Sequence, residues 1–230
     1  EKAKERKLFD TVPKRGNFQF DGYDICHLAG LNDEEFKRVR ERGLLDFRID
    51  ENKPPLSGSE ISNLAKLDDE SYENIEKRNL YPLLNEAFFE DYYGIYYVTS
   101  LAEADDETFN NVIKRELLKP FGKEGDDFEH LNYYEVIRFA KLDDETFRKV
   151  EERKLLEPRI ARGDIEFYPY SVIDFAKLTD EEFENVKKRA LTTSIQKRGK
   201  NQFSAYDISC LAKLDDEEFE KAKEFFVIDS

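Results

Sequence analysis

The stretch Leu142-Asp143-Asp144-Glu145-Thr146-Phe147 decides the fold, because close copies of it recur along the whole chain. Each copy ends on an aromatic residue, and these aromatics are Phe36, Tyr72, Phe109, Phe147, Phe183 and Phe219. Successive copies therefore lie 36, 37, 38, 36 and 36 residues apart. A fixed period in this range indicates stacked supersecondary units rather than one central core.

The residues around this phrase predict two helices in each repeat. Asn132 and Glu135 match a capping box at the start of the first helix, which we call helix A. Asp143 matches the N-cap of the second, helix B, whose acidic first turn suits the helix dipole. Apolar residues such as Phe147 and Val150 then follow at helical spacing.

The repeats predict an all-α fold, an α-solenoid of about six stacked two-helix repeats joined by variable loops or short hairpins. One continuous array is expected, in which residues 1–19 form the end of a preceding repeat plus a connection. The repeats are expected at residues 20–55, 56–92, 93–130, 131–166, 167–202 and, truncated, 203–230. Residues 1–5 repeat the letters of residues 220–224, so we expect the natural protein to continue beyond one or both ends.

The repeat plan resembles ankyrin and tetratricopeptide arrays in its helix–turn–helix–loop order and in its period. The signature of neither family, T-P-L-H or W-x-x-L-G, occurs in this chain. We therefore transfer no functional residue from either family.

Composition restricts the class of partner and the compartment. The net charge of −15 disfavours nonspecific binding to nucleic acid or to an acidic membrane, both of which require a basic surface. No apolar run approaches the length of a membrane span, so we expect a soluble protein. Cys26 and Cys210 lie far apart and at different repeat positions, which predicts no disulfide and a reducing compartment such as the cytoplasm. Secretion as an effector is the alternative.

The chain offers no recognisable catalytic or metal site. We interpret the acidic phrases as N-caps, because a calcium loop needs an internal glycine and a distal glutamate that they lack. No spacing of Cys26, His27, His130 and Cys210 matches a zinc site. Phosphate-binding glycine loops and nucleophile motifs are also absent from the sequence. We expect no enzyme, no cofactor, no metal and no small-molecule substrate.

An arginine recurs at the end of each predicted helix B except the last, where Phe225 takes its place. The row consists of Arg42, Arg78, Arg115, Arg153 and Arg189, with Arg6 at the same repeat position. We favour a structural role, namely capping of the helix C-terminus and ion pairs with the acidic first turn of a neighbour. The alternative is a row of contacts to phosphates or carboxylates of a ligand.

The face of helix A opposite its apolar stripe is the best candidate for partner binding. On this face an aromatic residue and usually a lysine flank two residues that vary between repeats, as expected for modular readers of a ligand. The candidate residues are Tyr23, Cys26, His27, Ser62, Asn63, Tyr96, Thr99, Ser100, Tyr134, Ile137, Arg138, Tyr170, Ile173, Asp174, Tyr206, Ser209 and Cys210.

These features predict a non-catalytic repeat scaffold that binds a protein or peptide through the helix A face and the loops between repeats. The aromatic connection at residues 88–97 is a further candidate contact. One alternative is a modular nucleic-acid binder that uses the variable helix A pairs, the arginine row and the basic loops at Lys14-Arg15 and Lys197-Arg198. The other alternative is a structural spacer.

Overall fold

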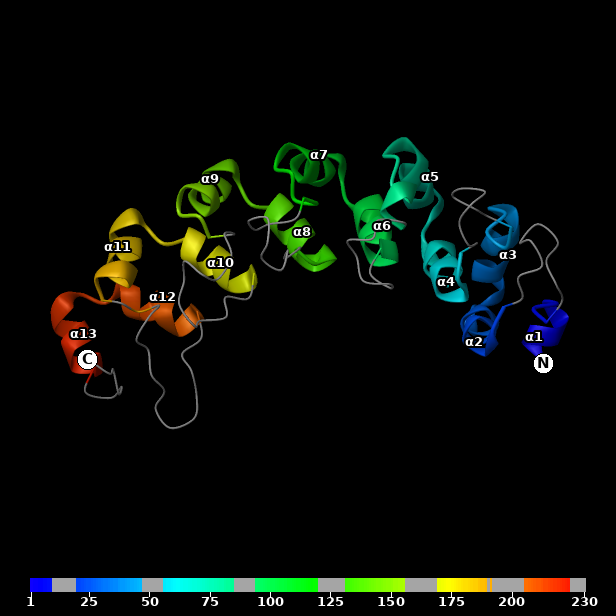
Figure 1. The fold of residues 1–230 in the computed structure, drawn as a ribbon, viewed down its shortest axis with the longest axis horizontal. Coiled ribbons are helices and arrows are strands. Elements are labelled where there is room, and N and C mark those ends of the chain that lie inside the picture. The colour runs from blue at the N-terminus through cyan, green and yellow to red at the C-terminus, as the bar shows by residue number, and fades with distance from the viewer. Residues whose placement is uncertain are drawn as a thin grey trace, which may run out of the picture. The chain divides into compact units, whose positions relative to one another are not determined.

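The computed structural model describes residues 1–9, 20–46, 56–84, 94–119, 131–155, 169–189, 191 and 205–223. These residues form α-helices and one 3₁₀-helix, and none of them belongs to a strand. They divide into unit 1, Glu1–Asp105, and unit 2, Asp106–Ser230, which we describe separately. Within each unit the same packing of neighbouring helices repeats, so the predicted all-α solenoid of helical repeats is confirmed (Figure 1).

The described residues of unit 1 form three helices A and two complete helices B. Its elements are α1 (Lys2–Glu5), α2 (Gly22–Gly30), α3 (Asp33–Glu41), α4 (Gly58–Lys66), α5 (Asp69–Lys77), η2 (Tyr81–Leu84) and α6 (Gly94–Glu103). Helices α2, α4 and α6 are helices A, whereas α3 and α5 are helices B. The short helix α1 corresponds to the last turn of a helix B. Each helix B packs against the helix A that follows it, and α4 also packs against α2 and α6.

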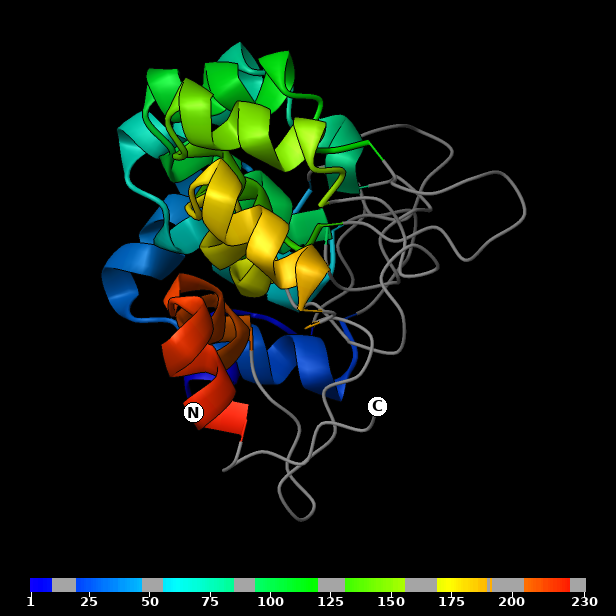
Figure 2. The same cartoon turned by 90° about the vertical axis from the view of Figure 1, so that its left-hand side faces the viewer.

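Unit 2 repeats this plan. Its elements are α7 (Asp106–Lys114), α8 (Tyr133–Ala140), α9 (Asp144–Glu152), α10 (Pro169–Ala176), α11 (Asp180–Lys188), α12 (Ala205–Lys213) and α13 (Asp216–Lys223). Helices α8, α10 and α12 are helices A, and α10 packs against both of the others. In unit 2 the helices A lie along one side while α7, α9 and α11 lie along the other (Figures 1 and 2).

The helix starts follow the predicted capping pattern. Asp143 accepts a hydrogen bond from the backbone N–H of Thr146 at 2.8 Å, and Pro169 is the first residue of α10. Reciprocal capping boxes join Asp21 to Asp24, Asn32 to Glu35, Ser57 to Glu60, Asn132 to Glu135 and Thr179 to Glu182. The prediction that the acidic phrases serve as N-caps is confirmed at Asn32, Asp68, Asp143, Thr179 and Asp215.

Helix B ends in a turn that closes on its own backbone. The N–H of Leu155 donates to the carbonyl oxygen of Val150 at 3.0 Å, and Lys154 between them has a φ of 54°. This is a Schellman motif, whose left-handed residue is most often glycine. Residues with positive φ at this position are Lys7, Gly43, Asn79, Glu116 and Lys154.

Helix A ends differently, because only two or three residues separate it from helix B. Leu31, which follows α2, has φ −58° and ψ 147°, so the chain turns directly into the next helix. No left-handed residue closes this end, and the last carbonyl groups of helix A therefore need partners from elsewhere. A small residue near this end lets other helices approach closely. Ala65, Ala102, Ala140, Ala176 and Ala212 have no exposed surface.

The first turn of α4 lies in close contact with α2. A Cβ atom on Gly58 would lie 2.5 Å from the Cα of Asp24, so only glycine fits there without movement of the backbone. The N–H of Gly58 donates to the carboxylate of Asp24 at 2.5 Å. Asp24 also belongs to the capping box of α2, so one carboxylate joins the first turns of two helices A. Gly22 occupies the corresponding position in α2 but has open space around it.

Candidate functional site

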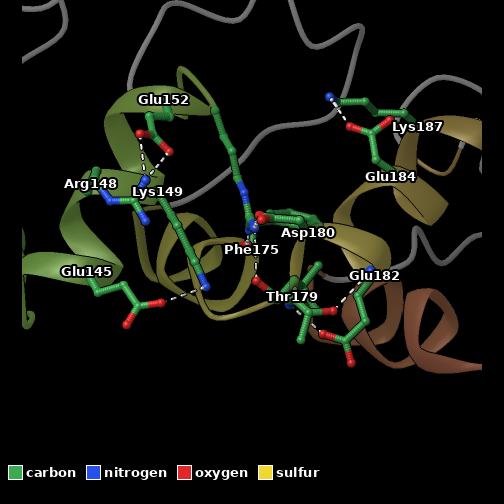
Figure 3. Close-up of polar contacts among 12 residues, drawn as sticks. Glu145, Arg148, Lys149, Glu152, Phe175, Thr179, Asp180, Glu182, Glu184 and Lys187 are labelled. Carbon is green, nitrogen blue, oxygen red and sulfur yellow. Dashed lines mark hydrogen bonds and ion pairs between the residues drawn. The ribbon is translucent and has the colours of Figure 1, made fainter.

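The arginine at the end of each helix B from α3 to α11 lies against the next helix A. Arg153 donates from Nη1 to the carbonyl oxygen of Phe175 at 2.7 Å and from Nη2 to that of Leu178 at 3.0 Å. Nη2 also donates to Oδ1 of Asp180 at 2.7 Å. Figure 3 labels two residues that accept from Arg153, Phe175 and Asp180. The guanidinium carbon lies 4.4 Å from the centre of the Phe183 ring. We call this set of contacts an arginine clamp.

The clamp recurs with nearly the same geometry in both units. The arginine–aspartate pairs are Arg6–Asp33, Arg42–Asp69, Arg115–Asp144, Arg153–Asp180 and Arg189–Asp216. Their N–O distances are 2.7–3.0 Å, and the arginine side chains are only 4–8% exposed. Arg78 makes the backbone part of the clamp, donating to the carbonyl oxygens of Leu101 (2.6 Å) and Ala104 (2.8 Å).

The predicted ion pairs between this row and the acidic first turn of a neighbour are confirmed. The predicted capping is wrong in one respect, because each guanidinium caps the helix A of the next repeat and not its own helix B. Helix B closes its own end, whereas the short link after helix A leaves carbonyl groups that accept from the arginine. Buried arginines whose donors are engaged in this way do not offer a surface to a ligand anion, which argues against the alternative anion-contact row.

An asparagine completes the cap in three repeats. The side-chain amides of Asn74, Asn111 and Asn185 donate to the carbonyl oxygens of Ala102, Ala140 and Ala212 at 3.0–3.1 Å. Each asparagine lies four residues before the clamp arginine, one helical turn away. Sequence reasoning missed this contact, although the recurring Asn-x-x-x-Arg spacing was a usable signal.

The clamps change the acidity of the carboxylates they engage. The hydrogen bond from Arg153, followed by its charge, lowers the pKa of Asp180. The hydrogen bond from Arg115 and the charge of Lys114 lower the pKa of Asp144 in the same way. These carboxylates are therefore held in the charged form that the clamp requires.

Tyrosines at one position of helix A are the main exposed aromatics. Tyr23, Tyr96, Tyr134 and Tyr206 are exposed by 60%, 37%, 67% and 68%. In the part of the chain that the structure describes, the other large exposed hydrophobic residues are Phe9 and Ile113. The side chain of Tyr170, the fifth predicted member, lies outside the described residues.

The residue one turn after this position, which is occupied by Ser59 in the second repeat, differs between repeats and is accessible in each. His27 packs edge-on against Tyr23, with ring centres 4.5 Å apart. A hydrogen bond with the Cys210 thiol raises the pKa of Tyr206. At this position Cys210 and Arg138 are exposed, whereas His27, Asn63, Ser100 and Asp174 are partly exposed. Of the preceding residues, Cys26 is exposed and Thr99 and Ile137 are partly exposed.

Three predicted outward positions are instead buried. Ser62, Ile173 and Ser209 retain almost no exposed surface, so the prediction that they face solvent is wrong. Their helices pack against neighbouring helices A as well as against a helix B, which covers more of each helix than the apolar stripe alone predicts. The hydroxyl oxygen of Ser209 has no hydrogen-bond partner among the described residues. The accessible face is therefore narrower than the sequence indicated.

Other candidate features are few in the described part of the chain. Both cysteines are free and exposed. No group of three or more His, Cys, Asp or Glu side chains there is arranged to hold a metal ion. No described helix is long and apolar enough to cross a membrane. The basic loops at Lys14-Arg15 and Lys197-Arg198, residues 88–93 of the aromatic connection and His130 lie outside the described residues.

Comparison of the chain with models of protein families, with curated proteins and with solved structures found no match. The functional argument therefore depends on the residues of this chain alone.

Proposed function

We propose that this chain is a non-catalytic repeat scaffold that binds a protein or peptide partner through the helix A face and the loops between repeats. The observation that carries the proposal is the exposure of Tyr23, Tyr96, Tyr134 and Tyr206 at one position of helix A. A tyrosine offers a large apolar surface and a hydroxyl group at a small entropic cost, which is why tyrosines are frequent at the centre of protein interfaces.

Variation beside a tyrosine that recurs in five of the six repeats, with Ser59 in its place in the second, supports binding rather than a purely structural role. The residue one turn further on is histidine, asparagine, serine, arginine, aspartate and cysteine in the six repeats. Packing does not require such variety, because these side chains are at least partly exposed. Each repeat would then contact a different residue of an extended ligand.

A peptide ligand is favoured over nucleic acid by the charge of the chain and by the clamps. The net charge of −15 opposes the approach of a polyanion. The arginine row, which was the strongest basis for phosphate contacts, is buried against the protein's own carbonyl groups and carboxylates. We therefore place nucleic-acid binding second.

The proposal is tested by selecting ligands for the purified chain from an unbiased display library of peptides. The Tyr134→Ala/Tyr206→Ala double variant should bind the selected peptides at least about tenfold more weakly, because aromatic anchors dominate such interfaces. Ile113→Ala is the matched control, since Ile113 is an equally exposed apolar residue on a helix B. Selection of no peptide, or equal affinities for both variants, would contradict the proposal.

A further inference from the structure

Lysines at the end of helix A have no partner among the described residues, whereas lysines on helix B do. Lys66, Lys141, Lys177 and Lys213 occupy one repeat position and are exposed, and no described residue pairs with them. On helices B the contrast is clear. Lys37, Lys77, Lys114, Lys149, Lys187, Lys188, Lys221 and Lys223 each lie within 3.9 Å of a carboxylate oxygen.

The acidic first turns do not neutralise these free lysines. Each lysine lies three residues before the aspartate of a clamp, yet that aspartate pairs with the arginine of the preceding helix B. The groups that lower the pKa of Asp180 are likewise Arg153, Lys149 and Arg148. Within the part of the chain that the structure describes, the positive charge at the end of each of these helices A is therefore not paired.

Three of these lysines follow one another in unit 2. Lys141 and Lys177 directly follow the last residues of α8 and α10, and Lys213 is the last residue of α12. Helix α10 packs against both α8 and α12. Arg138 adds another exposed cation that has no partner among the described residues. The acidic residues on these helices are Asp174, which is partly exposed, Asp207, which is exposed, and Glu135, which is engaged in the capping box of α8. The four cations outnumber them. In an acidic protein, this face of unit 2 carries net positive charge.

The spacing of packed helices matches a particular ligand geometry. Adjacent helices lie about 8–10 Å apart. A polyproline II segment rises about 3.1 Å per residue and has three residues per turn, so every third side chain points the same way at intervals of about 9 Å. One step from helix to helix thus corresponds to three residues of an extended peptide.

We propose that the face formed by α8, α10 and α12 binds an extended peptide that carries a carboxylate at every third residue. The carboxylates meet Lys141, Lys177 and Lys213, while the rings of Tyr134 and Tyr206 pack against the residues between them. This inference depends on the proposed function and specifies the chemistry of the ligand. A short peptide meets only this local positive surface, whereas a long polyanion also meets the acidic remainder of the chain.

Unit 1 supplies an internal comparison. Its helices A carry Gly30, Lys66 and Glu103 at the lysine position, so these residues have no net charge. The same scaffold therefore presents a different ligand preference in each unit, and the acidic peptide should bind through unit 2.

The test uses a fluorescent synthetic peptide with glutamate at every third position in a proline/alanine background. Its binding to the full chain is measured by anisotropy. The Lys141→Gln/Lys177→Gln/Lys213→Gln variant should bind about tenfold or more weakly, since each exposed ion pair contributes roughly a two- to fivefold effect. Moderate salt should weaken binding to the unaltered chain.

Two matched controls define the specificity. Lys119→Gln/Lys187→Gln/Lys221→Gln removes the same charge from unit 2 at lysines that pair within or beside their own helix, and should leave affinity nearly unchanged. A peptide of the same composition with its glutamates adjacent should bind more weakly than the spaced one. Equal loss in both lysine variants, or equal affinity for both peptides, would overturn the inference.

The remaining outcomes separate this inference from the proposed function. If the display selection finds ligands that depend on Tyr134 and Tyr206 while the spaced acidic peptide does not bind, the inference fails and the proposed function stands. If neither the library nor the designed peptide yields a ligand, both fail. If a single-stranded uridine oligonucleotide binds through the same lysines more tightly than the peptide does, the ligand class is wrong and the nucleic-acid alternative replaces both.

Discussion

The end of helix B and the exposed face of helix A use their cations in opposite ways. Arg153 is buried and bonded to two carbonyl groups, a carboxylate and an aromatic ring. Lys177, at the end of the adjacent helix A, is exposed and has no partner among the described residues. Both types of residue recur at a fixed position in most repeats, so recurrence alone does not distinguish a structural cation from a binding cation. The two kinds of cation are distinguished by whether the protein itself supplies a hydrogen-bond acceptor or a carboxylate for them.

The largest expected effect concerns the clamp. Arg153→Ala should lower the free energy of unfolding by about 2–4 kcal/mol, because it leaves buried carbonyl groups without a donor. Arg138→Ala, on the exposed face of helix A, should change it by less than about 0.5 kcal/mol. Urea denaturation of both variants measures the difference. Similar changes in the free energy of unfolding for both variants would contradict the distinction between the structural arginine and the exposed one.

Two glycines at the first position of helix A test whether the close contact between α2 and α4 contributes to stability. Gly58→Ala should cost about 1–3 kcal/mol, because the new Cβ would collide with the backbone at Asp24. Gly22→Ala, at the same position of α2, has room for the methyl group and should be neutral or stabilise by up to about 1 kcal/mol. Thermal denaturation followed by circular dichroism reports both. A stable Gly58→Ala protein would show that α2 and α4 need not approach so closely.

Substitutions in the turn that closes helix B should change the free energy of unfolding by a smaller amount. The change should have opposite signs at Lys154 and Gly43. Lys154→Gly should stabilise by about 0.5–1 kcal/mol, because Lys154 has a left-handed backbone conformation. Gly43→Ala places a methyl group on a residue with φ 63° and should destabilise by about 1 kcal/mol. The free space around Gly43 means that backbone strain is the expected cause. Changes of the same sign in both variants would argue against the motif.

Acid should weaken the clamps while leaving the lysine face charged. The pKa of Asp180 is lowered in the folded chain by Arg153, so the unfolded chain binds this proton at higher pH. The stabilisation is present in full above the unfolded pKa of about 3.9 and is lost as the pH falls through the lower folded value. The melting temperature should therefore decrease when the pH is lowered below about 4. The Asp180→Asn variant should show a smaller decrease. An unchanged pH profile in the variant would exclude this carboxylate as a contributor.

Local sequence signals predicted the fold because they act over a few residues. The capping box of Asn132 with Glu135, for example, joins residues three positions apart and was readable from the letters alone. The acceptors of Arg153 lie 22 to 27 residues further along, beyond a connection, so the sequence indicated a neighbour but not which carbonyl groups. The burial of Ser209 depends on packing between helices A, which the apolar pattern of one helix does not specify.

The central claim is that a partner meets the free cations of helix A and not the paired cations of helix B. Reductive methylation of lysines, followed by mass spectrometry with and without the spaced acidic peptide, tests it most directly. Our account predicts that Lys141, Lys177 and Lys213 react readily in the free chain and are protected by the peptide, while the reactivity of Lys187 and Lys221 does not change. Protection of the helix B lysines, with none on helix A, would contradict it.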